Sequence, residues 1–117
     1  MTSPGILVVE DEYLIRMLIE DMLDEMGYTV AAAVGSIGEA SAHATDGDFK
    51  AAILDVNVDG QEIFPVADMI AERGIPFVFV SGYGESSLPE RFRGRPTLQK
   101  PFQADRLKAI LEKLLSA

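Results

Sequence analysis

Acidic, hydroxyl and basic residues stand directly after short apolar runs at several places in this 117-residue sequence. These residues are Glu10, Asp11, Asp55, Ser81 and Lys100. Taken alone, an acidic residue after an apolar run is common in turns and at helix starts, where it suits the helix dipole. Taken together, carboxylates, a hydroxyl and a lysine could bind a hard metal ion and hold phosphoryl oxygens, and a carboxylate can be the nucleophile. What the residues can do therefore depends on whether the fold brings them together.

The apolar runs have the length and composition of strands that are buried on both faces of a sheet. The predicted strands span residues 6–9, 29–34, 51–55, 76–80 and 97–99. Between them, apolar residues recur at steps of three and four, which is the pattern of amphipathic helices. Helices are predicted to begin near Tyr13, Ser36 and Ile63 and to include residues 107–115, with at most a short helix at residues 88–92.

The first two helices carry more specific expectations. The stripe of the first helix is predicted to hold seven apolar residues, and Gly27 is well placed to end this helix. The seven are Leu14, Ile15, Leu18, Ile19, Met22, Leu23 and Met26. The second helix is predicted to start with a capping box, because Glu39 lies three residues after Ser36. His43 is the only histidine of the sequence, and no neighbouring residue indicates a catalytic role for it.

Five alternations of strand and helix, with connections of this length, predict right-handed crossovers and a parallel sheet. We therefore expect residues 1–117 to form one α/β domain with a flavodoxin-like, doubly wound, five-stranded parallel sheet. This (βα)5 arrangement is a three-layer α/β/α sandwich with helices on both faces of the sheet. In this topology the first, third, fourth and fifth strands are neighbours at or beside the switch point, so the five polar residues that follow them meet at the edge where such folds bind ligands.

The composition narrows the range of partners and locations. The formal net charge of −9 disfavours nucleic acids and anionic membranes as direct partners and favours cations and basic protein surfaces. The absence of cysteine excludes disulfides and thiolate chemistry, and the start of the sequence does not resemble a signal peptide. No apolar run approaches the roughly 20 residues that cross a bilayer, so we expect a cytoplasmic protein. The glycine-rich loops of dinucleotide and nucleoside triphosphate sites are missing from the sequence.

Four motifs, in their order along the chain, resemble a known family. They are Val9-Glu10-Asp11-Glu12, Leu54-Asp55, Ser81-Gly82 and Lys100-Pro101-Phe102, and together they closely resemble the CheY-like receiver domain of two-component response regulators over nearly the whole chain. The resemblance implies a bacterial phosphorelay protein rather than an enzyme with turnover. A histidine kinase or a histidine phosphotransfer protein would donate the phosphoryl group, and the signal would leave through contact with a downstream protein.

The resemblance also implies roles for the residues that handle the phosphoryl group. Asp55 would accept it by attacking the phosphohistidine of the partner in line. Lys100 would pair with Asp55 and then with the phosphoryl oxygens, while the Ser81 hydroxyl would turn to hydrogen-bond the phosphate. The bond between Lys100 and Pro101 is similar to one that is usually cis in this family.

A bound cation is expected on two grounds. Carboxylates within about 4 Å of one another repel by roughly 4 kcal/mol per pair at an effective dielectric constant near 20, so the cluster would need a compensating charge. Oxygen donors without histidine or sulfur favour Mg²⁺. The resemblance implies the same ion, bound directly by Asp11 and Asp55, through a water by Glu10, and by the backbone carbonyl of Asn57.

Two stretches depart from the usual pattern of the family. Thr97 occupies the position, three residues before Lys100, where receivers typically carry an aromatic residue whose rotamer reports phosphorylation. The loop after Asp55 is shortened, and the motif Phe-Val-Ser-Gly-Tyr-Gly at residues 79–84 resembles a receiver subgroup named for its Phe-Ala-Thr-Gly-Tyr type of motif. We hypothesise that Tyr83 and the glycines around it supply the moving element.

Several alternatives stay open from the sequence alone. The chain could be a regulator that binds a target through residues 81–96 and the last helix, a phosphate sink or shuttle without a target, or a piece of a longer protein. A Mg²⁺-dependent aspartyl phosphohydrolase shares the aspartate, lysine, serine and metal, but Asn57 stands where such enzymes have a second acid. A degenerate receiver that only binds partners is disfavoured, because every phosphorylation residue is present.

Overall fold

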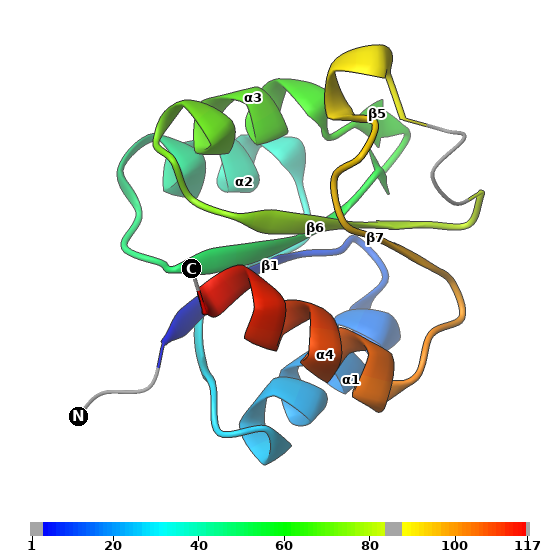
Figure 1. Cartoon of the computed structure of the whole chain (residues 1–117). Coiled ribbons are helices and arrows are strands. Elements are labelled where there is room, and N and C mark those ends of the chain that lie inside the picture. The colour runs from blue at the N-terminus through cyan, green and yellow to red at the C-terminus, as the bar shows by residue number, and fades with distance from the viewer. Residues whose placement is uncertain (1–3, 84–87, 117) are drawn as a thin grey trace.

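Five parallel strands form the central sheet of the computed structural model, which describes residues 4–83 and 88–116 (Figure 1). The strands are β1 (Gly5–Val9), β2 (Thr29–Val34), β3 (Ala51–Asp55), β6 (Phe77–Ser81) and β7 (Thr97–Gln99). They pair in the order β2-β1-β3-β6-β7, and every pair is parallel. The predicted strands and the predicted order are confirmed, and the carboxyl ends of β1, β3, β6 and β7 lie along one edge.

Helices cover both faces of the sheet, which confirms the predicted three layers. They are α1 (Tyr13–Glu25), α2 (Ile37–Asp46), α3 (Phe64–Glu72) and α4 (Ala104–Leu115). In Figure 1, α2 and α3 lie above the sheet and α1 and α4 below it. The connection from β6 to β7 differs from a full βα unit, because its described residues form only the 3-10 turn η2 (Glu90–Phe92). None of the helices in the described ranges is long and apolar enough to cross a bilayer.

Two apolar cores lie on either side of the sheet, because β1, β3 and β6 consist almost entirely of apolar residues and bury both faces. The core below α2 and α3 is aromatic. Five ring pairs have centroids 5.2 to 6.0 Å apart, mostly edge to face, and they join Phe64, Phe77, Phe79 and Phe92. The core beside α1 and α4 is aliphatic. The aromatic core ties η2 to the sheet through Phe92.

The apolar stripe predicted for α1 is wider than the face that the structure buries. Ile19 and Leu23 are fully buried against the sheet, but Leu14 is 74% exposed and Leu18 is 56% exposed. With 3.6 residues per turn, Leu14 lies about 140° around the helix from Ile19, so both cannot face the sheet. Four large apolar side chains of α1 are exposed and form what we call the α1 apolar patch: Tyr13, Leu14, Met17 and Leu18.

A β-hairpin that the sequence analysis did not predict follows β3. Its strands are β4 (Asn57–Val58) and β5 (Gln61–Glu62), which pair antiparallel. The turn between them places Asp59 at φ 52° and Gly60 at φ 81°. Positive φ at both central residues is the signature of a type I′ turn, for which Asp-Gly is a preferred sequence, so the signal was present in the chain.

Candidate functional site

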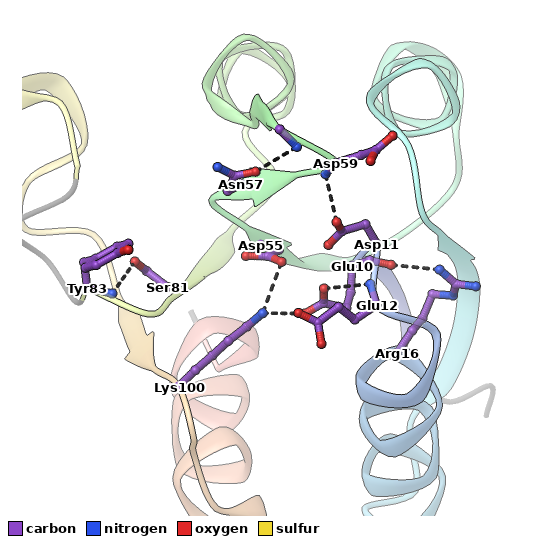
Figure 2. Close-up of polar contacts among 11 residues, drawn as sticks. Glu10, Asp11, Glu12, Arg16, Asp55, Asn57, Asp59, Ser81, Tyr83 and Lys100 are labelled. Atoms are coloured by element: carbon purple, nitrogen blue, oxygen red, sulfur yellow. Dashed lines mark hydrogen bonds and ion pairs between the residues drawn. The ribbon is translucent and has the colours of Figure 1, made fainter.

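The carboxyl edge of the sheet collects the polar residues that the sequence analysis selected. Glu10 directly follows β1, Asp55 ends β3, and Ser81 ends β6. Among the residues that the structure describes, these three are the buried ones with polar or charged side chains, at 1%, 6% and 3% exposure. Lys100, after β7, extends its side chain toward them from the next strand of the sheet (Figure 2). Burial of polar groups costs free energy of folding, so their concentration at one edge of the sheet indicates a functional site.

Three carboxylates of this edge form a cluster that fits a divalent cation. Glu10, Asp11 and Asp55 can each offer one oxygen, and these oxygens all lie within 4.8 Å of one another. All the donors are hard oxygens, with no histidine or cysteine in the cluster, and two of the three carboxylates are buried. This donor set suits Mg²⁺.

Lys100 bridges two of the carboxylates. Its Nζ donates to Glu10 Oε1 at 2.8 Å and to Asp55 Oδ2 at 3.2 Å. The contact with Asp55 was expected from the family resemblance, whereas the shorter one with Glu10 was not. Burial lowers the pKa of Lys100, but the hydrogen bond to Glu10 and the charges of both carboxylates outweigh this and raise it. Lys100 therefore stays charged, and one lysine balances only part of the negative charge of the cluster.

The second oxygen of Glu10 has a different partner. Glu10 Oε2 accepts a hydrogen bond from the backbone N–H of Glu12 at 3.1 Å. Glu12 is the residue that precedes α1, and its own side chain makes no capping hydrogen bond to the helix. The Glu12 side chain therefore does not cap the helix, whereas Glu10 binds the N–H of the N-cap residue with one carboxylate oxygen and Lys100 with the other. The carboxylate of Glu10 thus belongs to the cluster with Asp11 and Asp55 and binds Lys100.

The pKa of Asp55 is raised from 3.8 to about 7. Burial is the largest cause, the neighbouring Glu10 carboxylate adds to it, and Lys100 only partly opposes it. Without a cation, Asp55 therefore stays protonated to a higher pH than an ordinary aspartate. Glu10, Asp11 and Asp55 would hold a cation whose charge would offset that repulsion and favour ionised Asp55, which is the form that can act as a nucleophile.

The hairpin after β3 holds Asp11 from the other side of the cluster. Asp11 Oδ2 accepts a hydrogen bond from the backbone N–H of Asp59 at 2.9 Å, and Asn57 Oδ1 accepts one from Gly60 N at 3.0 Å (Figure 2). Burial raises the pKa of Asp11, but the Asp59 N–H and other hydrogen bonds outweigh it and leave the pKa below its ordinary value. The Asp59-Gly60 turn therefore orients one of the three carboxylates.

A cavity of about 210 Å³ opens beside Asp55. Its lining consists of Asp55, Val56, Asn57, Glu62, Ser81, Gly82 and Tyr83. Glu62 was not predicted to lie at the site, and it reaches this cavity because the hairpin turns the chain back. Ser81 Oγ accepts a hydrogen bond from Tyr83 N at 3.0 Å, and the Tyr83 side chain is 81% exposed. Gly84, the last residue of the predicted moving element, lies outside the described residues.

Two further predicted positions lie at β7. The Lys100–Pro101 peptide bond is cis, as the resemblance implied. Thr97, which stands where receivers usually have an aromatic residue, is half-buried, and its hydroxyl donates to the carbonyl of Arg95 at 3.1 Å. The Thr97 hydroxyl thus binds a carbonyl two residues away in the chain, and the residue is not aromatic. Tyr83, two residues after Ser81, has an exposed aromatic side chain.

Comparisons with known proteins point to one family. Residues 6–112 match the family model described as the response regulator receiver domain. The chain is 32% identical, over 115 residues, to the transcriptional regulatory protein PdtaR of Mycobacterium tuberculosis. That match covers 95% of this chain and 56% of PdtaR, so the chain spans about half the length of this relative.

Solved structures of similar fold include single receiver domains. The solution structure of SdrG from Sphingomonas melonis Fr1 superposes with a TM-score of 0.85 and is 45% identical, and the match covers 98% of both chains. SdrG has also been solved in a BeF3-activated conformation, which is 46% identical with a TM-score of 0.81. The receiver domain of the sensor histidine kinase PA1611 from Pseudomonas aeruginosa shares the fold, with a TM-score of 0.83 at 23% identity and 98% coverage of this chain. In that structure a magnesium ion is coordinated in the active-site cleft.

Proposed function

The chain belongs to the response regulator receiver family of two-component signalling, and from this premise we propose that Asp55 is its phosphoacceptor. The observation that carries the proposal is the environment of Asp55. Its carboxylate is buried at the carboxyl edge of the sheet, within 3.2 Å of Lys100 Nζ, in a cluster with Glu10 and Asp11, and it lines a cavity. Receiver domains are phosphoacceptors and signalling modules rather than typical enzymes, and this site has the parts that one phosphoryl transfer needs.

The proposed transfer takes a phosphoryl group from a phosphohistidine of a partner protein. An oxygen of Asp55 attacks the phosphorus in line, so that the P–O bond forms while the P–N bond breaks and the imidazole leaves. Lys100 holds the attacking carboxylate and then the transferred oxygens. Glu10, Asp11, Asp55 and the backbone carbonyl of Asn57 would hold Mg²⁺, which supplies positive charge next to the phosphoryl oxygens when bound.

Ser81 is proposed to report the transfer. Its hydroxyl lines the cavity beside Asp55 and accepts the N–H of Tyr83. When the hydroxyl turns toward the phosphoryl group, the hydrogen bond from the Tyr83 N–H to Ser81 Oγ breaks. The backbone after β6 is then less restrained and can change its conformation. This exchange would make Tyr83 the moving element of the domain, in place of the aromatic residue that Thr97 replaces.

The phosphodonor is proposed to dock beside the α1 apolar patch. A groove of about 360 Å³ adjoins this patch and reaches the site through Lys100. Its lining is mainly apolar: Ile15, Leu18, Ile19, Met22, Lys100, Pro101 and Phe102. A protein that presents a phosphohistidine to Asp55 must contact the surface next to the site, and an apolar helix face suits this groove. The net charge of −9 favours basic residues around that face.

The downstream contact is proposed for the region after β6 together with α4. Of that region, residues 84–87 lie outside the described residues. Support comes from the exposed Tyr83 and from the charge of this part of the sequence, since residues 88–117 carry seven basic and three acidic residues in a chain that is acidic overall. A hydrolase function is not proposed, because the side chain of Asn57 is an amide that bonds to Gly60 N and cannot act as the second acid.

The test is phosphorylation with a small donor. Wild type, Asp55→Asn and Asp46→Asn are each incubated with Mg²⁺ and acetyl phosphate, and the intact mass is measured. Asp46, at the end of α2, is an exposed aspartate remote from the site and serves as the matched control. We expect one added phosphoryl group on wild type and Asp46→Asn and none on Asp55→Asn. An unmodified wild type with unconsumed donor, or an adduct that survives in Asp55→Asn, would contradict the proposal.

A further inference from the structure

Glu10 is held at both its main chain and its side chain. Its N–H donates to the carbonyl of Val34 in β2 at 3.0 Å, and its carboxylate accepts from Lys100 and from the N–H of Glu12. The fourth contact is made by Arg16, whose Nη1 donates to the Glu10 carbonyl at 2.8 Å (Figure 2). This carbonyl belongs to the peptide group that joins Glu10 to Asp11, and therefore joins two of the three carboxylates of the metal site.

Arg16 reaches this carbonyl from the first turn of α1. Its guanidinium lies over the ring of Tyr13, at 5.5 Å from the ring centroid, and the side chain is half-buried. A charged donor on a carbonyl makes a stronger hydrogen bond than a neutral one, and the planar guanidinium supported by an aromatic ring has little freedom to leave it. Arg16 therefore restrains the rotation of the peptide between Glu10 and Asp11.

Gly35 makes room for this contact. A Cβ at position 35 would lie 2.6 Å from Nη1 of Arg16 and 3.6 Å from the carbonyl oxygen of Glu10. The φ of Gly35 is outside the left-handed region, so its backbone conformation does not require glycine. The requirement is space: a methyl group at this position would push the guanidinium away from the carbonyl.

We propose that Arg16, with the space left by Gly35, is a positioning residue that orients Glu10 and Asp11 for Mg²⁺. The inference rests on the proposed function of the site, because it assigns Arg16 to the cation that the site would bind. In this role Arg16 would contact neither the cation nor the phosphoryl group, because its guanidinium binds the main-chain carbonyl of Glu10. It acts through the peptide group whose orientation sets the direction of both carboxylates, and the outer contacts of metal ligands commonly affect metal affinity by 10- to 100-fold.

Arg73 offers a matched control for a purely structural role. Like Arg16, it donates to main-chain carbonyls, at 3.0 Å to Ala44 and 2.7 Å to Gly47, and it packs over an aromatic ring, that of Phe49. Its contacts hold the end of α2 before β3 begins, whereas Arg16 acts where β1 ends. Loss of Arg73 should therefore lower stability without changing the metal site.

The experiment measures Mg²⁺ binding by titration calorimetry, without any phosphodonor, alongside the denaturant midpoint of each variant. We expect Arg16→Met to weaken Mg²⁺ binding about tenfold and Arg16→Lys to restore part of it. Gly35→Ala should weaken binding in the same way although Arg16 is still present, and the double variant should bind no worse than Arg16→Met, because both changes break one contact. Gly38→Ala, at a glycine with nothing within 4 Å of its added Cβ, should bind like wild type.

The outcomes separate this inference from the proposed function. An affinity of Arg16→Met and Gly35→Ala within twofold of wild type would overturn the inference, as would an equal loss of affinity in Arg73→Met. If Arg16→Met fails to fold, Gly35→Ala decides alone. A wild type that does not bind Mg²⁺ also overturns the inference. Phosphorylation of Asp55 is read independently by the mass assay, so its failure leaves the comparison of affinities intact.

Discussion

At the scale of single residues, the protonation of Asp55 links the stability of the protein to its chemistry. Asp55 is buried next to Glu10, and its pKa is raised to about 7 in the folded protein, compared with 3.8 for an ordinary aspartate. The folded state therefore binds this proton more tightly than the unfolded state does. Its free energy of unfolding, without metal, should fall as the pH rises from about 4 to about 7 and should then level off.

Asp55→Asn removes this buried charge, and we expect the variant to be more stable than wild type at pH 8 in the presence of a chelator. The gain should be on the order of 2 kcal/mol, which is less than the full pKa shift would give, because the variant also loses the ion pair with Lys100. Urea unfolding of both proteins at pH 8 and pH 4 measures this gain. The difference in their free energies of unfolding should nearly vanish at pH 4. A wild type that is the more stable protein at pH 8 would show that Lys100 keeps Asp55 ionised.

The same proton should compete with Mg²⁺. Since the cation requires an ionised Asp55, the affinity for Mg²⁺ should rise as the pH increases toward about 7 and change little above it, with about a tenfold loss per pH unit well below. Calorimetry at pH 6 and pH 8, in two buffers with different ionisation enthalpies, should show proton release on binding near neutral pH. A constant affinity and no proton release across this range would contradict the raised pKa.

At the scale of the elements, the β4–β5 hairpin links the strand that carries Asp55 to the carboxylate of Asp11. The contact is one hydrogen bond, from Asp59 N to Asp11 Oδ2, and it requires the positive φ of Asp59 and Gly60. Glycine adopts such a conformation freely, whereas alanine is penalised by about 1 kcal/mol or more. The turn should therefore control both local stability and the metal site.

Gly60→Ala is expected to lower the free energy of unfolding by about 1 kcal/mol and to weaken Mg²⁺ binding several-fold. The methyl group meets no atom within 4 Å, so the effect would come from the backbone alone. Gly74→Ala is the matched control, since Gly74 also has a positive φ and open space but follows α3, away from the site. Urea unfolding and calorimetry are compared for both variants. Equal Mg²⁺ affinities would mean that the turn does not orient Asp11.

At the scale of the whole molecule, two apolar cores stabilise the fold, and one polar edge of the sheet carries the candidate site. The cores on both faces of the sheet leave its carboxyl edge as the place where the described polar residues are buried. The α1 apolar patch is an exception to the burial of large apolar side chains, and it lies on the helix that starts at this edge. Its exposure cannot stabilise the isolated domain, which favours a role in contact with another protein.

Leu14→Gln tests that role. Because Leu14 is 74% exposed, we expect a change in stability within about 0.5 kcal/mol and unchanged labelling by acetyl phosphate. Transfer from a histidine phosphotransfer protein that phosphorylates wild type should slow several-fold. Ala42→Gln, on an exposed position of α2, is the control and should transfer at the wild-type rate. Equal rates in both variants would place the donor elsewhere on the surface.

The sequence by itself determined the strands of the central sheet, their order and the polar residues that follow them. Apolar runs that end in Asp55 and Ser81 predict buried parallel strands, and right-handed crossovers then bring their carboxyl ends to one edge. The expected contact of Lys100 with Asp55 is present for the same reason. These features depend on composition and chain order, which a single sequence contains.

Only the tertiary structure decided how the residues at that edge contact one another. Periodicity places Leu14 and Leu18 on the apolar stripe of α1 but does not say which members of that stripe face the sheet, and in the structure both are exposed. The contacts of Lys100 with Glu10 and of Asp59 with Asp11 join segments far apart in the chain. Such contacts depend on the distance and direction between packed elements, and these quantities exist only once the sheet and its helices are assembled.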